Sequence, residues 1–458
     1  MSSEWRLTAL RELVGIKHGF AFKGEYFVNG KTPLQLTTPG NFSVGGGFQR
    51  GKGKYYAGPV PSEYILGVGD VIVSMTDLSK AADTLGYAAV VPKTEGVTWL
   101  HNQRVGLVRP NEGVEVCMDY IHYLMRSPSY RHWVVSTATG STVKHTSPDR
   151  ILAYEFLLPT LVEQKQIGSI LSLLDERVAL LHDTISTLDK IARVLFRSWF
   201  VDFDPVSAKA EGRKPEGMDT STAALFPSTF ENSKSGMVPS GWQYFRVEEL
   251  AEKVGMGPFG SNIKVDTFVS EGVPVISGQH LREILVEDSV FNFVTNSHAE
   301  KLSNSCVRAG DVIFTHAGSI GQVALLHRDS SFDRYVLSQR QFFLRCNRLR
   351  MQPEWMAYYF RSAQGQHQLL ANTSQVGVPS IARPVSYLRS IEVLVPSKEL
   401  IDVFSDVADS LHQSILLKRS QIKNLTRLRD TLLPRLISGQ LRLPEATAAT
   451  EKLLSEAI

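Results

Sequence analysis

The sequence has few of the features that would tie a protein to a membrane or an oxidising compartment. Its 458 residues include only three cysteines, Cys117, Cys306 and Cys346. They lie too far apart for a CxxC pair, and so few cysteines favour a reducing compartment. No stretch approaches the roughly 20 consecutive apolar residues that span a bilayer. The N-terminal residues mix charges into their apolar positions, unlike a signal peptide. We therefore expect a cytoplasmic protein with no membrane partner.

Motifs of the common catalytic and cofactor-binding classes are also missing. The chain has no Walker A loop, no HExxH zinc motif and no GxSxG elbow. It also has no Pro-Pro pair, which the (N/D)PP(Y/F) motif of amino-group DNA methyltransferases requires. The run GMGPFG (Gly255, Gly257 and Gly260) matches GxGxxG, but the residues after it alternate as in a strand, so it predicts a glycine-rich turn. The sequence predicts neither a catalytic centre nor a bound metal or cofactor.

An excess of one charge sign is absent too. The 49 Lys and Arg residues exceed the 46 Asp and Glu residues by only three, which excludes a blanket of positive charge but permits a local basic surface. Hydrophobic residues make up 43% of the chain and charged residues 21%, as in ordinary globular proteins. A chain of this length predicts two or more folded domains.

An internal duplication is the clearest positive feature of the sequence. An offset of 237 residues relates Trp5 to Trp242, Gly140 to Gly377, Pro159 to Pro396 and Leu188 to Leu425. Between these anchors the offset drifts by a few residues, as loops of different length would make it: GDVIVS at 69–74 matches GDVIFT at 310–315. The chain therefore consists of two copies of one unit.

Each copy begins with short β-branched runs between turns and ends with a long helical pattern. The apolar positions of the first pattern are spaced alternately four and three apart, as in a coiled coil: Ile167, Leu171, Leu174, Val178, Leu181, Ile185, Leu188, Ala192, Leu195 and Trp199. The second pattern, 237 residues later, keeps eight apolar sites and admits Lys418 and Arg429. Two similar units related by a pseudo-two-fold axis bring such helices together antiparallel. We expect an α+β protein with two mixed α/β domains separated by two long antiparallel helices.

These patterns predict domain boundaries. We expect a first mixed domain at 1–158, a first long helix at 159–200, a linker rich in Pro, Gly, Ser and charge at 201–241, a second mixed domain at 242–395, a second long helix at 396–445 and a tail at 446–458.

Polar, donor-rich loops are the candidate DNA contacts, although each residue has a structural or solvated alternative. In the first copy they are Lys17, Lys23, Ser74, Thr76, Gln103, Arg104, Lys144 and His145. In the second copy they are Ser261, Lys264, Thr315, His316, Gln339, Arg340 and Arg383. The aromatic residues Trp199, Phe200 and Phe203 are candidates for docking a partner subunit, with packing at the helix end as the alternative.

Several of these runs together resemble the specificity (S) subunit of type I restriction-modification systems. They are the segment from LPTLVEQKQIG to SWFVDFDPV, the second-copy GPFGSNIK and GDVIFTHAGSIGQVALL, and the closing LRDTLLPRLISGQL, in the family's order. The first-copy GIKHGFAFKG departs from this pattern. The resemblance covers essentially the whole chain and implies two target recognition domains held apart by two antiparallel helices.

The resemblance also implies a function and partners. Each domain reads one half of a bipartite, asymmetric site on double-stranded DNA, and the helices set the gap between the halves. The chain itself has no catalysis and binds no cofactor. Two modification (M) subunits use S-adenosylmethionine to methylate adenine, and restriction (R) subunits use ATP and Mg. The alternatives are the DNA-reading part of a self-sufficient restriction-methylation enzyme, or a coiled-coil protein-binding scaffold. The target bases depend on loop placement and do not follow from the sequence.

Overall fold

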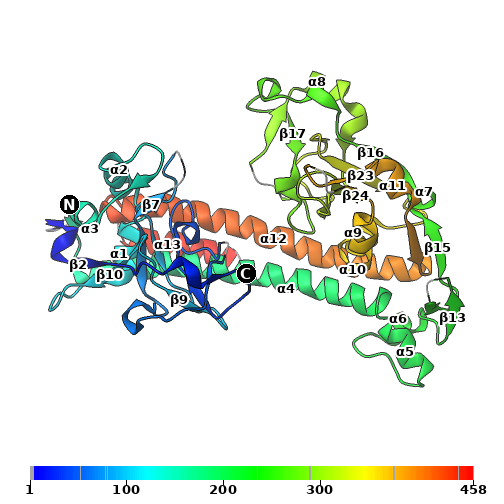
Figure 1. Cartoon of the computed structure of the whole chain (residues 1–458), viewed down its shortest axis with the longest axis horizontal. Helices are drawn as coiled ribbons and strands as arrows, with labels where there is room; N and C mark the ends of the chain where they lie inside the picture. The colour runs from blue at the N-terminus through cyan, green and yellow to red at the C-terminus, as the bar shows by residue number, and fades with distance from the viewer. Residues whose placement is uncertain are drawn as a thin grey trace. The chain divides into compact units, whose positions relative to one another are not determined.

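The chain divides into two compact units in a computed structural model. The structure describes residues 5–456 except 52, 78, 80, 235, 288, 289, 375, 376 and 442, and the side chains of 261, 449 and 451–456 also lie outside the described part. Unit 1 comprises Met1–Leu180 and Gln421–Ile458, and unit 2 comprises Leu181–Ser420. Each unit holds one mixed α/β domain and a stretch of both long helices (Figure 1). Among the described residues, no helix has the length and apolar character needed to cross a membrane.

The two long helices, α4 (Leu161–Phe200) and α12 (Lys398–Ile437), have 40 residues each, and the duplication offset of 237 relates both of their ends. In unit 1, Asp175 of α4 contacts Arg429 of α12 at 2.6 Å. In unit 2, the rings of Phe196 and Phe200 lie 5.3 Å from the ring of Phe404. Asp175, in the first half of α4, contacts the last part of α12, and Phe196 and Phe200, at the end of α4, contact the first part of α12. This confirms the antiparallel pairing (Figure 1).

A reciprocal pair of capping hydrogen bonds starts α4. The Thr160 hydroxyl accepts from the backbone N–H of Glu163, and the Glu163 carboxylate accepts from the backbone N–H of Thr160 at 2.9 Å. This reciprocal pair satisfies N–H groups that a helix end leaves open. Pro159, directly before it, favours an extended chain and separates the helix from the preceding strand.

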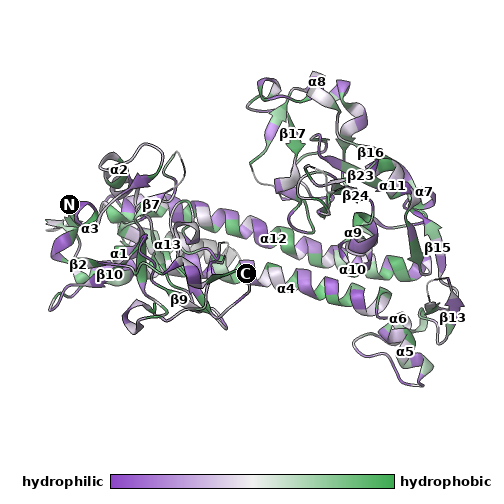
Figure 2. Ribbon diagram, in the orientation of Figure 1, coloured by the Kyte–Doolittle hydropathy of each residue, from purple (hydrophilic) through white to green (hydrophobic). Residues whose placement is uncertain are grey.

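The heptad positions of α4 form the buried seam that the sequence predicts. Seven of the ten are buried (Ile167, Leu171, Leu174, Leu181, Ile185, Ala192 and Trp199), and the other three are half-buried (Val178, Leu188 and Leu195). Hydrophobic and hydrophilic residues alternate along both helices in Figure 2. Burial of a large aliphatic side chain contributes about 1.5–3 kcal/mol, so this seam is a large part of the stability of the helix pair.

The domain of unit 1 packs two four-stranded sheets against each other. One has the antiparallel order β2-β10-β6-β8 and the other the order β3-β5-β4-β9. Ile72, Leu107 and Trp99 belong to the core that the two sheets share. The elements of this unit besides the long helices are β1 (Arg6–Ala9), β2 (Val14–His18), β3 (Phe27–Val28), β4 (Leu34–Leu36), β5 (Tyr55–Tyr56), β6 (Val71–Ser74), β7 (Thr76–Asp77), β8 (Ala88–Val90), β9 (Thr98–Leu100), β10 (Val105–Pro110), α1 (Met118–Leu124), α2 (Pro128–Ser136), β11 (Lys144–His145), α3 (Pro148–Leu152), β12 (Glu155–Leu158) and α13 (Leu443–Glu456).

The domain of unit 2 repeats this plan. Its sheets have the orders β16-β23-β20-β21 and β18-β17-β22-β19. Ile313, Phe343 and Leu337 belong to its core. The elements are β15 (Gln243–Arg246), α7 (Val247–Leu250), β16 (Ala251–Met256), β17 (Val273–Ile276), β18 (Asn292–Val294), α8 (Asn296–Lys301), β19 (Cys306–Val307), β20 (Asp311–Thr315), β21 (Val323–Leu325), β22 (Tyr335–Leu337), β23 (Gln341–Cys346), α9 (Pro353–Arg361), α10 (Ala363–Leu370), β24 (Thr373–Ser374), β25 (Ser380–Ile381), α11 (Pro384–Ser390) and β26 (Glu392–Val395).

The segment expected as a linker, 201–241, contains regular structure. It forms α5 (Asp204–Ala210), α6 (Thr220–Ala224) and a hairpin of β13 (Phe230–Ser233) and β14 (Gly236–Pro239). Apolar residues spaced between its prolines and glycines explain this order, since Val206 and Phe226 are buried. Towards the C-terminus, α12 ends at Ile437, eight residues before the predicted boundary, because Gly439 adopts a left-handed φ of 73°.

Each domain is fixed to its long helix by an equivalent tyrosine. In unit 1, the Tyr123 hydroxyl donates to Asp175 at 2.9 Å, and Arg126 and Arg429 each contact the same carboxylate at 2.6 Å. In unit 2, the Tyr358 hydroxyl lies 3.0 Å from His412 Nε2, at the position 237 residues after Asp175. Burial lowers the pKa of His412 to about 3, so this second contact is neutral near pH 7. The charged residue Arg429 fits the helix seam because Asp175 neutralises it.

Asp175→Asn should destabilise unit 1. The change leaves the buried Arg126, only 3% exposed, without its counter-charge, and loss of one partner of a buried ion pair costs about 3–5 kcal/mol. Asp183→Asn, at an exposed position of the same helix, is the matched control and should change the free energy of unfolding by less than about 0.5 kcal/mol. Urea denaturation measures both, and equal effects of the two changes would contradict the assignment.

The same contact predicts an acid sensitivity. Burial alone raises the pKa of Asp175, but Arg126 and Arg429 outweigh it and lower this pKa to about 2. Because the folded pKa lies below the unfolded value, the stabilisation is complete above the unfolded pKa and is lost as the pH falls towards 2. The wild type should lose stability over this range more steeply than Asp175→Asn.

Candidate nucleic-acid interface

The candidate DNA contacts of unit 1 gather at one edge of the sheet β2-β10-β6-β8, where β2 and β6 end and β10 begins. The backbone N–H of Met75, just after β6, donates to the carbonyl of Arg104 at 3.0 Å. The Met75 carbonyl accepts from the N–H of Thr146 at 3.0 Å. These two bonds bring the segments 74–77, 103–104 and 144–146 together at what we call the first edge.

Unit 2 builds the same frame with different side chains. The N–H of His316, just after β20, donates to the carbonyl of Arg340 at 2.9 Å, and the His316 carbonyl accepts from the N–H of Ile381 at 2.8 Å. His316 thus stands where Met75 stands in unit 1. We call this place, where β16 and β20 end and β23 begins, the second edge.

A glycine is required at each edge because the chain leaving the first sheet strand passes very close to a neighbouring loop. A Cβ on Gly19 would lie 2.1 Å from the carbonyl oxygen of Asn102, and one on Gly257 would lie 1.9 Å from that of Ser338. The first glycine follows β2 and the second follows β16. The motif GMGPFG therefore begins in the last two residues of β16 and makes a close-packed turn from Gly257 onwards. The first copy has the equivalent glycine despite its different sequence.

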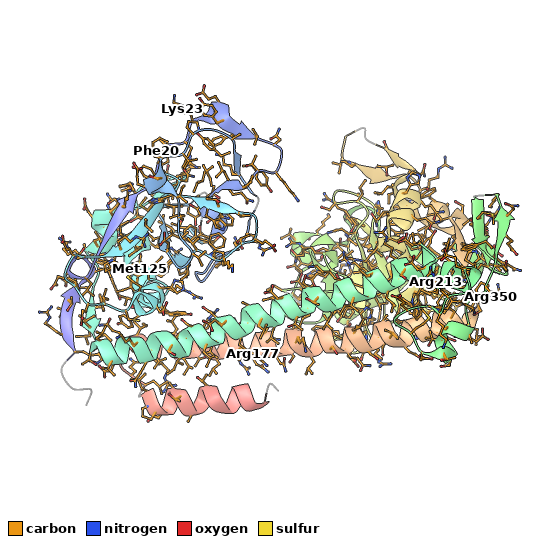
Figure 3. All side chains as sticks on the ribbon, turned by 90° about the horizontal axis from the view of Figure 1, so that it is seen from below. Phe20, Lys23, Met125, Arg177, Arg213 and Arg350 are labelled. Carbon is orange, nitrogen blue, oxygen red and sulfur yellow. The ribbon has the colours of Figure 1, made fainter. Side chains whose placement is uncertain are left out.

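The side chains at the first edge differ in exposure. Lys17, Gln103, Arg104 and His145 are exposed and Lys144 is half-buried. Thr76 is buried, with its hydroxyl 3.2 Å from His145 Nδ1, and Ser74 is buried and donates to the carbonyl of Thr76 at 3.1 Å. The hydroxyls of Ser74 and Thr76 therefore hold the edge together from inside. Lys23 is exposed but lies outside the frame, beside Glu25, and Figure 3 shows it far from α4, with Met125 much closer to the helix.

The second edge has a similar division between buried and exposed groups. Gln339 and Arg340 are exposed, and His316 is half-buried with its Nε2 3.1 Å from the carbonyl of Gln339. Thr315 is 2% exposed and donates to Gln322 at 3.0 Å, so its hydroxyl is already satisfied inside the protein. Lys264 is exposed, and the side chain of Ser261 lies outside the described residues.

The strand register shows which residue of unit 2 corresponds to His145. His145 is paired with Thr76 in β11 and β7, and the corresponding bridge in unit 2 joins Ser380 to Ala317. Ser380 is therefore the counterpart of His145. Arg383 lies beyond this bridge, exposed and with a left-handed φ of 45°. The sequence could not show this, because the offset between the copies changes inside the domain.

Local hydrogen bonds fix the charge state around the first edge. His101 is fully buried and its Nε2 lies 2.8 Å from the carbonyl of Val105; burial lowers its pKa to about 4, so it is a neutral donor. Burial alone would raise the pKa of Asp77, but the backbone N–H groups of Ser79 and Thr84 outweigh this effect and lower it. The positive charge at this edge therefore comes from lysine and arginine side chains.

Two further cations lie beside the first edge, Arg50 and Lys54. Both are exposed, and the backbone carbonyl of Lys54 accepts from the N–H of Leu36 at 2.9 Å. Their run, RGKGK, is a basic signal in the sequence, but the same composition fits a solvated loop, so motif comparison alone does not single it out.

The three aromatic candidates for partner docking lie in unit 2, where they pack within the protein. Trp199 and Phe200 are 5% and 6% exposed. The Phe200 ring lies 5.6 Å from that of Trp355, and the Phe203 ring lies 5.5 Å from that of Trp242. Packing at the helix end, the alternative that the sequence allowed, accounts for Trp199 and Phe200. Only the half-buried Phe203 is accessible to a partner without unpacking this core.

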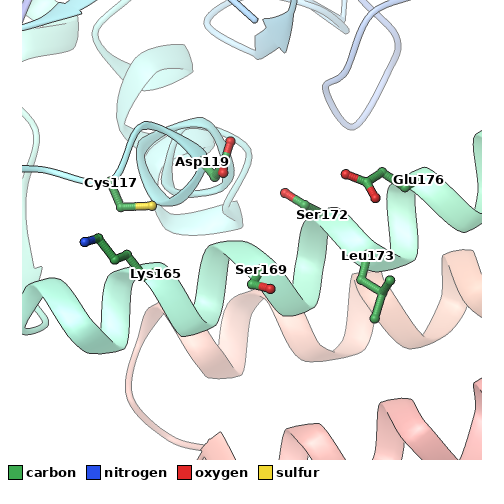
Figure 4. A pocket seen from close by; sticks show the side chains of 7 residues that line it. All are labelled: Cys117, Asp119, Lys165, Ser169, Ser172, Leu173 and Glu176. Atoms are coloured by element: carbon green, nitrogen blue, oxygen red, sulfur yellow. The ribbon is translucent and has the colours of Figure 1, made fainter.

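A pocket of about 390 Å³ lies elsewhere in unit 1, between α1 and α4 (Figure 4). It is lined by Cys117, Asp119, Lys165, Ser169, Ser172, Leu173 and Glu176. None of the predicted DNA contacts lines it. Within the described residues, no group of three or more His, Cys, Asp or Glu side chains is placed to hold a metal ion.

Comparison with known proteins shows which family the chain resembles. A sequence profile described as "Type I restriction modification DNA specificity domain" matches residues 2–190. The HindI specificity subunit of Haemophilus influenzae is 24% identical over 73% of this chain and 80% of its own length, and the MjaIX specificity subunit of Methanocaldococcus jannaschii is 22% identical over 79% and 76%. Residues 2–190 therefore match the type I specificity-domain family, and the likeness to type I specificity subunits extends over most of the chain. The solved S subunit of M. genitalium, 15% identical and covering 95% of this chain and 96% of that one, has the same fold with a TM-score of 0.54.

Gly19→Ala should damage the first edge. The new methyl group would force the backbone away from Asn102, and overpacking of this kind costs about 1–3 kcal/mol of the free energy of unfolding. Gly24→Ala is the control, because no heavy atom lies within 4 Å of its added Cβ. Urea denaturation compares the two variants, and a Gly19→Ala variant as stable as Gly24→Ala would show that the close approach is not needed.

Proposed function

We propose that this specificity subunit gives a type I restriction-modification complex its DNA sequence specificity, with each domain reading one half of a bipartite, asymmetric target. The observation that carries the proposal is the backbone frame built twice, through Met75 in unit 1 and His316 in unit 2, with different exposed side chains on it. One frame with two sets of side chains suits two readers with two different targets.

The chemistry of base recognition supports this division. Contacts to phosphates position a protein on a duplex, and side chains that reach base edges in the grooves distinguish sequences. Equivalent places at the two edges carry the exposed Lys17 and the half-buried Gly255, the exposed His145 and the half-buried Ser380, and the buried Met75 and the half-buried His316. These pairs differ in charge, size and hydrogen-bonding capacity, so the two edges favour different bases.

The remaining partners follow from the family. The chain itself supplies no catalysis and binds no cofactor; two modification subunits provide S-adenosylmethionine-dependent adenine methylation, and restriction subunits provide ATP- and Mg-dependent cleavage. The long helices α4 and α12 set the unread gap and bind the modification subunits. Because Trp199 and Phe200 are buried, Phe203 and the exposed faces of the helices remain for that contact.

Binding and methylation assays on the purified chain, alone and with a modification subunit, test the proposal. The chain should show sequence-specific DNA binding, and methyl transfer should require the partner. Methylation by the chain alone would favour a self-sufficient restriction-methylation enzyme. Absence of sequence preference in both preparations would favour a protein-binding scaffold.

Exchange of residues 242–395 for the matching domain of a relative should change one half of the target and leave the other intact, because the first edge lies entirely in unit 1. Binding selection from a randomised duplex library measures both halves. A change in both halves, or in neither, would contradict the model of two independent readers.

A further inference from the structure

The loop that carries Arg50 and Lys54 lies at the same side of unit 1 as the first edge. Strands β4 and β9 are parallel, with Leu36 paired to Leu100, so their carboxyl ends meet. Gln35 of β4 pairs with Tyr55, which places Lys54 beside Leu36 at this end. The chain leaving β9 continues directly into His101–Arg104 of the first edge.

Buried polar contacts hold this loop in one conformation. Asn41, 2% exposed, donates its side-chain amide to the carbonyls of Gln49 and Arg50 at 3.2 and 3.0 Å. The Gln49 side chain in turn donates to the carbonyls of Gly40 and Phe42. Gly51 has a left-handed φ of 57°, and a Cβ there would lie 2.6 Å from the Gly40 carbonyl. The backbone that carries Arg50 is therefore fixed before any ligand binds. This lowers the entropic cost of binding.

The two cationic side chains on this fixed loop are available. Both are exposed, and neither forms an ion pair with any carboxylate of the described residues. The Lys54 ammonium lies 4.1 Å from the centre of the Phe27 ring, a cation–π contact that limits its freedom without neutralising its charge. Exposed cations on a held backbone, beside an edge that carries Arg104 and Lys17, favour a polyanion.

Unit 2 has the same turn without the cations. The N–H of Gln49 donates to the Asn41 carbonyl at 2.9 Å, and the N–H of Glu287 donates to the His280 carbonyl at the same distance. The sequence from Glu287 onwards is EDSVF, where unit 1 has QRGKGK. At the places of Arg50 and Lys54 the sequence of unit 2 therefore has no cation, and the one arginine of its turn, Arg282, comes earlier in the chain.

We propose that Arg50 and Lys54 bind backbone phosphates of the first half-target, so that unit 1 supplies a sequence-independent hold on DNA that the corresponding loop of unit 2 does not. This inference rests on the proposed DNA-reading function. The occupant is a phosphate pair of duplex DNA, since the fixed, unpaired charges match a charged backbone and not a base edge.

The double variant Arg50→Ala/Lys54→Ala in the full chain tests the assignment. The matched control is Lys31→Ala/Lys93→Ala, which removes two exposed lysines from the opposite end of the same sheet, before β4 and before β9. Fluorescence anisotropy measures the affinity for target and non-target duplexes between 50 and 200 mM salt. Two lost phosphate contacts should lower the magnitude of the slope of log affinity against log salt by about 1.8. The ratio of wild-type affinity to variant affinity should therefore fall about twelvefold between 50 and 200 mM salt.

The expected result is the same loss on target and non-target DNA, no loss in the control, and recovery of the slope in Arg50→Lys/Lys54→Arg, which keeps both charges. A slope equal to that of the control would overturn the inference, as would a loss confined to one base pair of the target, which would assign a base contact. Failure of the proposed function would be separate, because the wild type would then show no preference for any duplex.

Discussion

The apolar seam between α4 and α12 is the constraint on which the rest of the molecule depends, because both helices run through both units and each domain packs on the helix pair. The seam accepts the charged residue Arg429 because Asp175 is shared between it and Arg126. In unit 2 the corresponding place has the neutral pair of Tyr358 and His412. The duplication therefore preserves the position of the tyrosine and the helix register while the chemistry of the contact changes.

The same separation of frame and chemistry governs the two edges. Backbone hydrogen bonds at Met75 and His316, and the close approach at Gly19 and Gly257, do not depend on the side chains exposed to solvent. Exposed side chains can therefore differ between the copies without loss of the fold. Proteins that read different DNA sequences on one scaffold need this property, because base specificity depends on a few side chains on a fixed frame.

Part of this organisation could be predicted from the sequence, because it depends on periodicity. The offset between Trp5 and Trp242 and the heptads from Ile167 to Trp199 predict the duplication and the helix pair. Exposure at the edges could not be predicted, since a hydroxyl such as that of Thr315 can bond to a buried protein group just as it can bond to a DNA base. Helix-end packing of Trp199 and the structural counterpart of His145 also depend on contacts between residues distant in the sequence. The cations of the 50–54 loop carry a sequence signal, but their place beside the first edge follows only from the pairing of β4 with β5 and β9.

Lengthening the helix pair tests most directly the claim that it sets the distance between two readers. One heptad inserted after Leu181 and one after Lys418, positions related by the duplication offset, keeps the seam and adds about 10 Å to each helix, or roughly three base pairs at 3.4 Å each. Binding is measured on duplexes that carry both half-targets with unread gaps of different length. The account predicts that both half-targets stay the same and that the preferred gap lengthens by about two to three pairs. Weaker binding is also consistent with it, because the added pairs rotate one half-target around the duplex. Tight binding to the original gap would contradict it.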